Sequence, residues 1–274
     1  MHGNDDSNVS NDVNIDRKRC GNVSARLQPI IVGGDVLAVM IRGLYPEFAC
    51  EAFIAAFEGG ITDKFRGYAV EPQLARIERP LYEAAADGGL AAYFAEAHRT
   101  NWAIQRAMYP IMTSATVIWT VLDNAWPAGA LLLRIDGRPC PFGISRKVDD
   151  GGETGIHSDM PNWDYAVEEF LSARTNLSFL VYPSQFEGGE LELWPDTINQ
   201  PAIFKGLMDK ASGYALDRKR VGPPAVTIHP GKGDAVLFDA RRLHAVREVR
   251  KGPRYSQSGF INVRGLHEPL SLYH

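Results

Sequence analysis

Two histidines and one aspartate in the second half of the chain have the types and the spacing of a metal-binding group. His157 and Asp159 stand two residues apart in the run GIHSDM, so on extended backbone both side chains project to the same side. His244 follows in DAVLFDARRLHAV, another strand-like run. Two histidines and one carboxylate can hold ferrous iron on one face of the metal and leave the opposite positions open. The pattern therefore predicts a mononuclear metal site made by His157, Asp159 and His244.

A candidate anion site lies beyond His244. Arg254 and Ser256 are also two residues apart, and on a strand they share one face. A guanidinium fork beside a hydroxyl suits one carboxylate bound through two hydrogen bonds. Arg254 and Ser256 are thus predicted to bind a carboxylate.

These residues belong to a series of short motifs that resembles the Fe(II)/2-oxoglutarate-dependent oxygenases. The motifs are HSD at the first histidine, GGEL at Gly188 to Leu191, GDAVLFD at Gly233 to Asp239, His244, and RYS at Arg254 to Ser256. The resemblance covers residues 129–264. It implies a jelly-roll fold, the double-stranded β-helix, with Fe(II) bound by His157, Asp159 and His244. It also implies O₂ and 2-oxoglutarate as cosubstrates, with the distal carboxylate of 2-oxoglutarate held by Arg254 and Ser256.

The first half of the chain resembles one subgroup of that family. The opening VMIRGLYP, the Ala-rich helices and an insertion before GDAVLFD look like a free-standing bacterial subgroup, which includes an N-succinyl amino acid hydroxylase and halogenases of indole alkaloids. In those halogenases glycine replaces the carboxylate ligand and frees a position for chloride. This chain has Asp159 there, which favours hydroxylation. Related prolyl hydroxylases have a tyrosine shortly before the first histidine, where this chain has Val148, so the other cosubstrate contacts are unassigned.

Each motif also has a purely structural interpretation. A lone histidine-x-aspartate pair is weak evidence, because a histidine on a strand is more often a hydrogen-bonded structural residue. The joint pattern is stronger, because His244 and Arg254 follow in the order that the resemblance requires. GGEL alone indicates a turn before a strand. No metal role is expected for the other histidines, which are His2, His98, His229, His267 and His274.

Fewer residues in the sequence indicate a substrate-binding site than indicate the metal and anion sites. Trp163 follows the HSD motif closely enough to line the mouth of the site, although it is equally typical of a packing residue. Arg79 and Tyr82 fall in a segment that, in the subgroup, runs close to the bound substrate. An arginine there would suit a substrate carboxylate, and a solvated basic turn is the other interpretation. We expect a small-molecule substrate that is anionic or amino-acid-like, such as a free or N-substituted amino acid or a related specialised metabolite.

Two further functions remain open at this stage. A peptidyl hydroxylase of the prolyl type would need an open groove for a protein. A jelly-roll binding module or a metal-dependent isomerase would use no O₂, but a 2-oxoglutarate clamp made by Arg254 and Ser256 has no purpose there. The sequence favours a dioxygenase that hydroxylates an unactivated C–H bond of a small molecule.

The elements that must position these residues divide the chain into a helical and a β-rich part. Residues 1–28 are polar and are expected to form a disordered tail, and residues 29–274 a single domain. Supporting helices are expected over 46–125 and a cupin-like jelly-roll core over 129–264, which makes an α+β fold. An insertion at 195–224 is predicted to be a lid over one end of the sheet. The β-rich runs are ALLLRI, ETGIHSD, LSFLVYP, GELELW, AVTIHP, DAVLFDA, LHAVREV and RYSQSGFINV.

The composition is that of an ordinary globular protein. The 274 residues are 45% apolar and 23% charged, with a formal net charge of −4. This excludes collagen-like, disordered and disulfide-scaffold classes and argues against nucleic-acid or membrane partners. Residues 205–264 are nonetheless basic, with 13 Lys and Arg against 5 Asp and Glu. Three cysteines without a C-x-x-C pair, and no signal-peptide pattern, predict a cytoplasmic protein, and the oligomeric state is not predicted.

Overall fold

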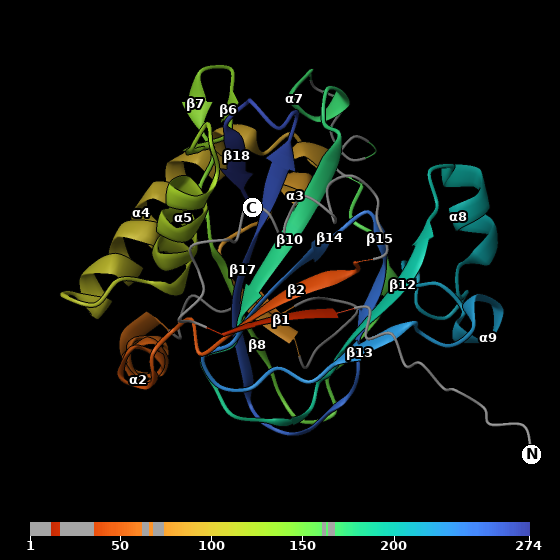
Figure 1. Cartoon of the computed structure of the whole chain (residues 1–274), viewed down its shortest axis with the longest axis horizontal. Coiled ribbons are helices and arrows are strands. Elements are labelled where there is room, and N and C mark those ends of the chain that lie inside the picture. Colours follow the sequence, from red (N-terminus) through yellow and green to blue (C-terminus); the bar gives the residue numbers. More distant parts are fainter. Residues whose placement is uncertain (1–11, 17–35, 62–65, 68–73, 161–162, 164–167) are drawn as a thin grey trace, which may run out of the picture.

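The alternation of apolar and polar residues along the strands produces two facing β-sheets with helices outside them (Figure 1). The structure is a computed structural model, and it describes residues 12–16, 36–61, 66–67, 74–160, 163 and 168–274. The predicted α+β class with a jelly-roll core is confirmed. In this part of the chain, every helix is too short or too polar to cross a membrane.

The larger sheet has ten strands and carries the predicted anion site on β17. Its path runs β1, β2, β14, β10, β17, β8, β4 and β3, and β18 joins β17 to β5. All neighbours are antiparallel except the β1–β2 and β18–β5 pairs. The strands are β1 (Asp12–Asp16), β2 (Ala38–Arg42), β3 (Arg66–Gly67), β4 (Leu74–Ile77), β5 (Ala130–Leu132), β8 (Ile144–Val148), β10 (Thr175–Val181), β14 (Ala235–Asp239), β17 (Arg254–Val263) and β18 (Leu270–Tyr273).

The smaller sheet carries both histidines of the predicted metal site. Its antiparallel order is β13, β12, β15 and β9. These strands are β9 (Thr154–His157), β12 (Leu191–Thr197), β13 (Val226–Ile228) and β15 (Arg242–Val246). Two short pairs complete the β structure, namely β6 (Arg134–Ile135) with β7 (Arg138–Pro139), and β11 (Glu187–Gly188) with β16 (Val249–Lys251).

The helices precede or interrupt the strands of the core. α2 (Glu47–Ala56), α4 (Leu90–Met108) and α5 (Ser114–Ala125) cover the outer face of the larger sheet (Figure 1). The Thr113 side chain caps α5 by accepting a hydrogen bond from the Thr116 backbone N–H. Among the described residues, the remaining helical elements are the π-helical turn η2 (Phe57–Ile61), α3 (Leu81–Ala86), α7 (Glu168–Leu171), α8 (Pro201–Leu207) and α9 (Arg218–Val221).

Strand alternation divides the apolar side chains between two cores. On β2, Val39 and Ile41 join the helices in one cluster, whereas Ala38 and Met40 join Leu191 of β12 in another. The larger sheet therefore packs on helices with one face and on the smaller sheet with the other. Polar side chains that point between the sheets are removed from water, so each of them needs a partner.

Several segments differ from the sequence-based expectation. Each of the eight β-rich runs contains a strand, but β8 was not among them because Arg146 and Lys147 break its apolar pattern. The tail prediction is wrong for residues 12–16, which form β1 beside β2. This segment alternates polar residues with Val13 and Ile15, and the edge of the sheet offers it unpaired backbone groups. The other residues of 1–28 lie outside the described part of the chain.

The insertion at 195–224 packs on the outer face of the smaller sheet. Phe204 of α8 joins Ile156 of β9 and Leu243 of β15 in one apolar cluster. The Leu216 backbone N–H also donates to the Ile156 carbonyl, at 2.7 Å. These contacts cover the outer faces of β9 and β15, the strands that carry the histidines. The function of the insertion as a lid stays a prediction.

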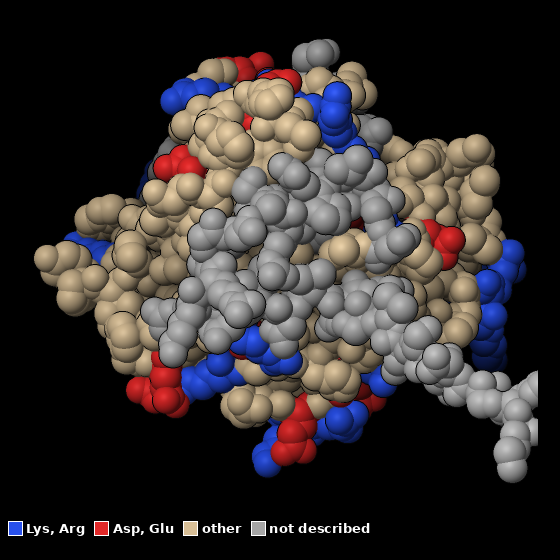
Figure 2. All heavy atoms as spheres, in the orientation of Figure 1, with Lys and Arg blue, Asp and Glu red and all other residues tan. Residues whose placement is uncertain are grey.

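Much of the basic character of residues 205–264 lies on the surface. Figure 2 shows Lys and Arg side chains along the edge of the molecule where α9 lies, and Arg218, Lys219 and Arg220 are exposed there. Arg254, in contrast, is buried.

A buried pair, Glu78 and His274, lies beside the ends of β4 and β18. The side chains are 2% and 1% exposed, with Glu78 Oε2 3.2 Å from His274 Nε2. Burial raises the pKa of Glu78 well above its usual value. Burial, together with the charges of Arg146 and Arg76, lowers the pKa of His274 to about 3. The folded pair therefore holds one proton over a wide pH range.

This shared proton should make stability depend on pH. In the unfolded chain Glu78 loses its proton near pH 4.5 and His274 near pH 6.5, so above pH 6.5 the folded pair binds one proton more than the unfolded pair. The free energy of unfolding should then fall by up to roughly 1.4 kcal/mol per pH unit as the pH rises above 6.5. Chemical denaturation of the wild type and of Glu78→Gln would measure the difference, because the variant lacks this proton. Equal slopes in the two proteins would contradict the shared proton, and Glu268→Gln, at an exposed glutamate, is the control.

Candidate functional site

The pairing of β9 with β15 brings the two predicted histidine ligands face to face. His157 is directly opposite His244 in the ladder, and their ring centroids are 4.2 Å apart. Their neighbours Ile156 and Leu243 point the other way, into the apolar cluster under the insertion. The ring of His244 meets Phe238 between the sheets, with centroids 4.9 Å apart. Both imidazoles therefore face the space between the sheets.

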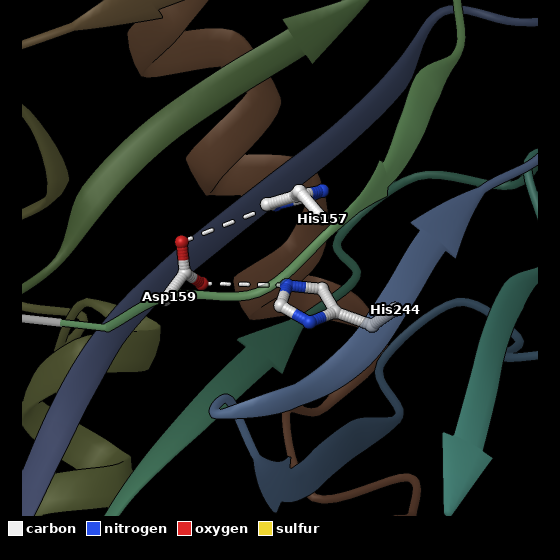
Figure 3. A group of neighbouring side chains, drawn as sticks. All are labelled: His157, Asp159 and His244. Atoms are coloured by element: carbon white, nitrogen blue, oxygen red, sulfur yellow. Dashed lines mark ion pairs between the residues drawn. The ribbon is translucent and has the colours of Figure 1, made fainter. Parts of the chain in front are cut away.

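Asp159 completes the group from the segment that follows β9 (Figure 3). Its backbone N–H donates to the carbonyl of Ala240, at 2.8 Å, which holds this segment in place. The carboxylate faces both rings, with Oδ2 3.3 Å from His244 Nε2 and Oδ1 3.9 Å from His157 Nε2. One donor atom of each residue lies within 4.8 Å of the others. The structure thus brings together all three residues predicted as metal ligands.

Each imidazole is oriented by a carbonyl group of its own strand. His157 Nδ1 lies 2.8 Å from the Gly155 carbonyl oxygen, and His244 Nδ1 lies 2.9 Å from that of Arg242. Because a carbonyl oxygen can only accept, Nδ1 carries the proton and donates it. Each Nε2 then keeps its lone pair on the side of Asp159, which is the tautomer that a metal ligand needs.

Burial and neighbouring charges set the protonation of the three groups. Burial, followed by the charge of His244, lowers the pKa of His157 to about 4, so this ring is neutral at neutral pH. Burial alone would raise the pKa of Asp159, but its interactions with His244, His157 and Arg146 outweigh burial and keep this pKa below its usual value. The Asp159 side chain is 30% exposed, so the group is accessible from solvent. A neutral imidazole at His157 and an ionised carboxylate at Asp159 are the forms in which these groups bind a divalent cation.

The predicted anion site lies on β17 and faces the smaller sheet. Arg254 and Ser256 are 2% and 1% exposed. The guanidinium lies over the rings of Tyr182 and Phe186, 4.9 and 5.5 Å from their centroids. Within the described residues, Arg254 Nε, Arg254 Nη2 and Ser256 Oγ have no hydrogen-bond partner. A buried cation with open donors is costly unless an anion binds it, so these atoms indicate a site for a carboxylate.

Tyr182 and Gly189 contribute to this anion site in ways that the sequence did not reveal. Burial raises the pKa of Tyr182, and Arg254 opposes the rise, because the hydroxyl and the guanidinium are close. Gly189 has a φ of +62°, and a Cβ there would meet Arg254 Cδ at 2.8 Å. The GGEL motif therefore leaves room for the arginine besides forming a turn. A tyrosine at a strand end is typical of a core residue, so only its neighbours across the sheet reveal its place in the site.

The structure gives each residue predicted to bind substrate a partner within the protein. Arg79 forms an ion pair with Asp87. The Tyr82 hydroxyl is 3.4 Å from Glu83 Oε1. Trp163 packs edge-on against a phenylalanine of α8, with ring centroids 5.8 Å apart. The roles of these three residues in substrate binding stay predictions.

Comparison with known sequences connects this geometry to a family. Residues 142–262, which contain both candidate sites, match the family model of the 2OG-Fe(II) oxygenase superfamily. The L-gamma-glutamyl-L-propargylglycine hydroxylase of Streptantibioticus cattleyicolor is 31% identical over 138 residues. That match covers 48% of this chain and 48% of the hydroxylase, so it spans about half the length of each.

Solved structures share the fold at low sequence identity. An N-substituted L-amino acid dioxygenase from Burkholderia ambifaria has a TM-score of 0.61 at 14% identity, covering 92% of this chain and 91% of that one. The non-heme alpha-ketoglutarate-dependent epimerase SnoN from nogalamycin biosynthesis has a TM-score of 0.50 at 14% identity, covering 87% and 84%. The ligand motifs, the jelly-roll fold and the family match agree, and residues 142–262 therefore form a 2OG-Fe(II) oxygenase domain.

Proposed function

We propose that this chain is a 2-oxoglutarate-dependent dioxygenase that hydroxylates an unactivated C–H bond of a free or N-substituted amino acid or a related specialised metabolite. The observation that carries the proposal is the presence of two sites in one interior, a three-residue metal group and a buried arginine with open donors. The metal group alone would also suit an isomerase, and the arginine alone would also suit a binding module. Together they suit a metal and a carboxylate cosubstrate, as the family requires.

We assign Fe(II) to His157, Asp159 and His244. Two neutral imidazoles and one carboxylate are the donor set of non-haem Fe(II) oxygenases. The hydrogen bonds from each Nδ1 hold the rings so that both Nε2 atoms face the Asp159 carboxylate. Asp159 would offset one unit of the metal charge. When bound, Fe(II) and 2-oxoglutarate supply the O₂ activation that attack on a C–H bond requires.

We assign the distal carboxylate of 2-oxoglutarate to Arg254, Ser256 and Tyr182. Two open guanidinium donors and the Ser256 hydroxyl would replace the hydrogen bonds that the carboxylate makes with water. The rings of Tyr182 and Phe186 cover the guanidinium and keep water away, which strengthens a charged contact. These residues bind and orient the cosubstrate, and none of them has to move a proton.

The substrate class is supported by relatives of the chain. One relative is named as a hydroxylase of L-gamma-glutamyl-L-propargylglycine, and one protein of the same fold as an N-substituted L-amino acid dioxygenase. Both names denote amino acid derivatives. Asp159 supports hydroxylation, because it keeps a third protein ligand on the metal.

Loss of one metal ligand should abolish metal binding and turnover. We expect His244→Ala and Asp159→Ala to weaken Mn(II) binding in calorimetry by more than about 100-fold, because even residues that only orient metal ligands contribute roughly 10- to 100-fold. Substrate-dependent succinate formation should disappear in both variants. His229→Ala removes a histidine that is 70% exposed and should leave Mn(II) affinity unchanged. Undiminished turnover in both ligand variants would overturn the metal assignment.

Anaerobic addition of Fe(II) and 2-oxoglutarate should give a visible charge-transfer band. Arg254→Lys keeps the charge but loses the fork, so it should weaken 2-oxoglutarate binding by roughly 10- to 100-fold. Tyr182→Phe should weaken 2-oxoglutarate binding by roughly 5-fold, which is the effect of one neutral hydrogen bond. Tyr255→Phe is the control, because its hydroxyl lies 3.3 Å from Glu58 on the opposite face of β17. A colourless wild-type mixture that binds no 2-oxoglutarate would favour a binding module or an isomerase.

A substrate screen separates the small-molecule proposal from a peptidyl hydroxylase. Free L-amino acids, N-acyl-L-amino acids and proline-containing peptides would each be added to the loaded enzyme. We expect O₂ uptake coupled to succinate formation with an amino acid or its N-acyl derivative. Coupling with peptides alone would refute the proposed substrate class.

A further inference from the structure

Arg146 is a charged residue of the interior that neither proposed site uses. It lies on β8 directly opposite Ser256 of β17, so the two side chains share one face of the larger sheet. Arg254 belongs to the same face and lies two residues along β17, a step of roughly 7 Å. Arg146 is partly exposed, whereas Arg254 is enclosed.

The charge of Arg146 is not neutralised by a carboxylate of the described structure. Its guanidinium donates a hydrogen bond to the Ser258 hydroxyl and forms no ion pair with a described residue. The neighbouring Arg76, opposite it on β4, differs because it is paired with Glu83. The Arg146 guanidinium thus has donors and charge available for a ligand.

Arg146 also borders the space between the sheets that holds the metal group. Like Ser256 and Arg254, it lies on the face of the larger sheet that is turned toward the smaller sheet, which carries both histidines. The adjacent pair of Glu78 and His274 holds one proton and is neutral overall, so it does not cancel the arginine. The wall of the interior beside the metal group therefore keeps a positive charge.

We propose that Arg146 binds an anionic group of the substrate, a carboxylate in an amino-acid-like molecule, and so selects acids over neutral analogues. This inference rests on the proposed function, because it presumes that metal and 2-oxoglutarate are already bound. The enclosed Arg254 suits the cosubstrate, and the more exposed Arg146 suits the ligand that enters afterwards. A guanidinium–carboxylate contact would fix one end of the substrate and thereby determine which carbon lies near the metal.

The test compares acids with their carboxamides on the anaerobic Fe(II) and 2-oxoglutarate complex. L-amino acids and N-acetyl-L-amino acids, each with its carboxamide, would be titrated while the visible band is followed. We expect the wild type to bind the acid at least roughly tenfold more tightly than the amide. Arg146→Gln should weaken binding of the acid by roughly 10- to 100-fold and binding of the amide by less than about threefold. Arg146→Lys should restore part of the preference, because it keeps the charge without the fork.

Lys147→Gln is the matched control. Lys147 is the next residue of β8, faces the opposite side and pairs with Asp149 at 2.8 Å, so this variant should behave as the wild type.

Three results would overturn the proposal for Arg146. The first is an unchanged preference for acids in Arg146→Gln. The second is a weakened 2-oxoglutarate affinity in that variant, because it would place Arg146 in the cosubstrate site. The third is a wild type that prefers the amides. Failure of the proposed function is distinct, since the wild type would then form no charge-transfer band.

Discussion

The antiparallel pairing of β9 with β15 is the constraint on which the site depends. It places His157 opposite His244 with both rings inward, while Ile156 and Leu243 point outward. A slip of one residue would exchange the two sets and turn the imidazoles away from the interior. The insertion opposes such a slip, because Leu216 pairs with Ile156 and apolar side chains cover the outer face. The β9–β15 ladder therefore carries the metal group on its inner face and the apolar contacts with the insertion on its outer face.

The interior holds charged groups that lack partners among the described residues. Arg254 is enclosed with two open donor nitrogens, and the Asp159 carboxylate faces two imidazoles. Charges held in this way cost free energy, and removal of an existing partner from a buried pair typically costs about 3–5 kcal/mol. The larger sheet can tolerate this cost because its other face packs on helices in an extensive apolar cluster. A bound cation and a bound dicarboxylate would supply the missing partners, so ligand binding and folding should support each other.

The strands and the residue types of the site could be predicted from the sequence. The contacts between residues that are far apart in the chain could not. The triad and the Arg254–Ser256 pair were predictable because alternation along one strand decides which side chains share a face. Tyr182 was not, because its contact with Arg254 joins two strands far apart in sequence. Arg146 was hidden for a related reason, since a polar residue facing the interior breaks the apolar pattern that marks a strand. Arg79 was predicted to bind the substrate, and its ion pair with Asp87 was not foreseen because it depends on local turn geometry.

The carbonyl partners of the two histidines have a consequence for how such a site can diversify. Each ring is oriented by the backbone two residues before it, not by another side chain. Substitutions of the side chains around the metal group can therefore change the shape of the site without changing the tautomer of either imidazole, provided that β9 and β15 stay paired. A centre with this property can persist while nearly everything around it is replaced. That is consistent with a shared fold at 14% identity, and it makes the β9–β15 ladder a transferable frame on which new specificities can be built.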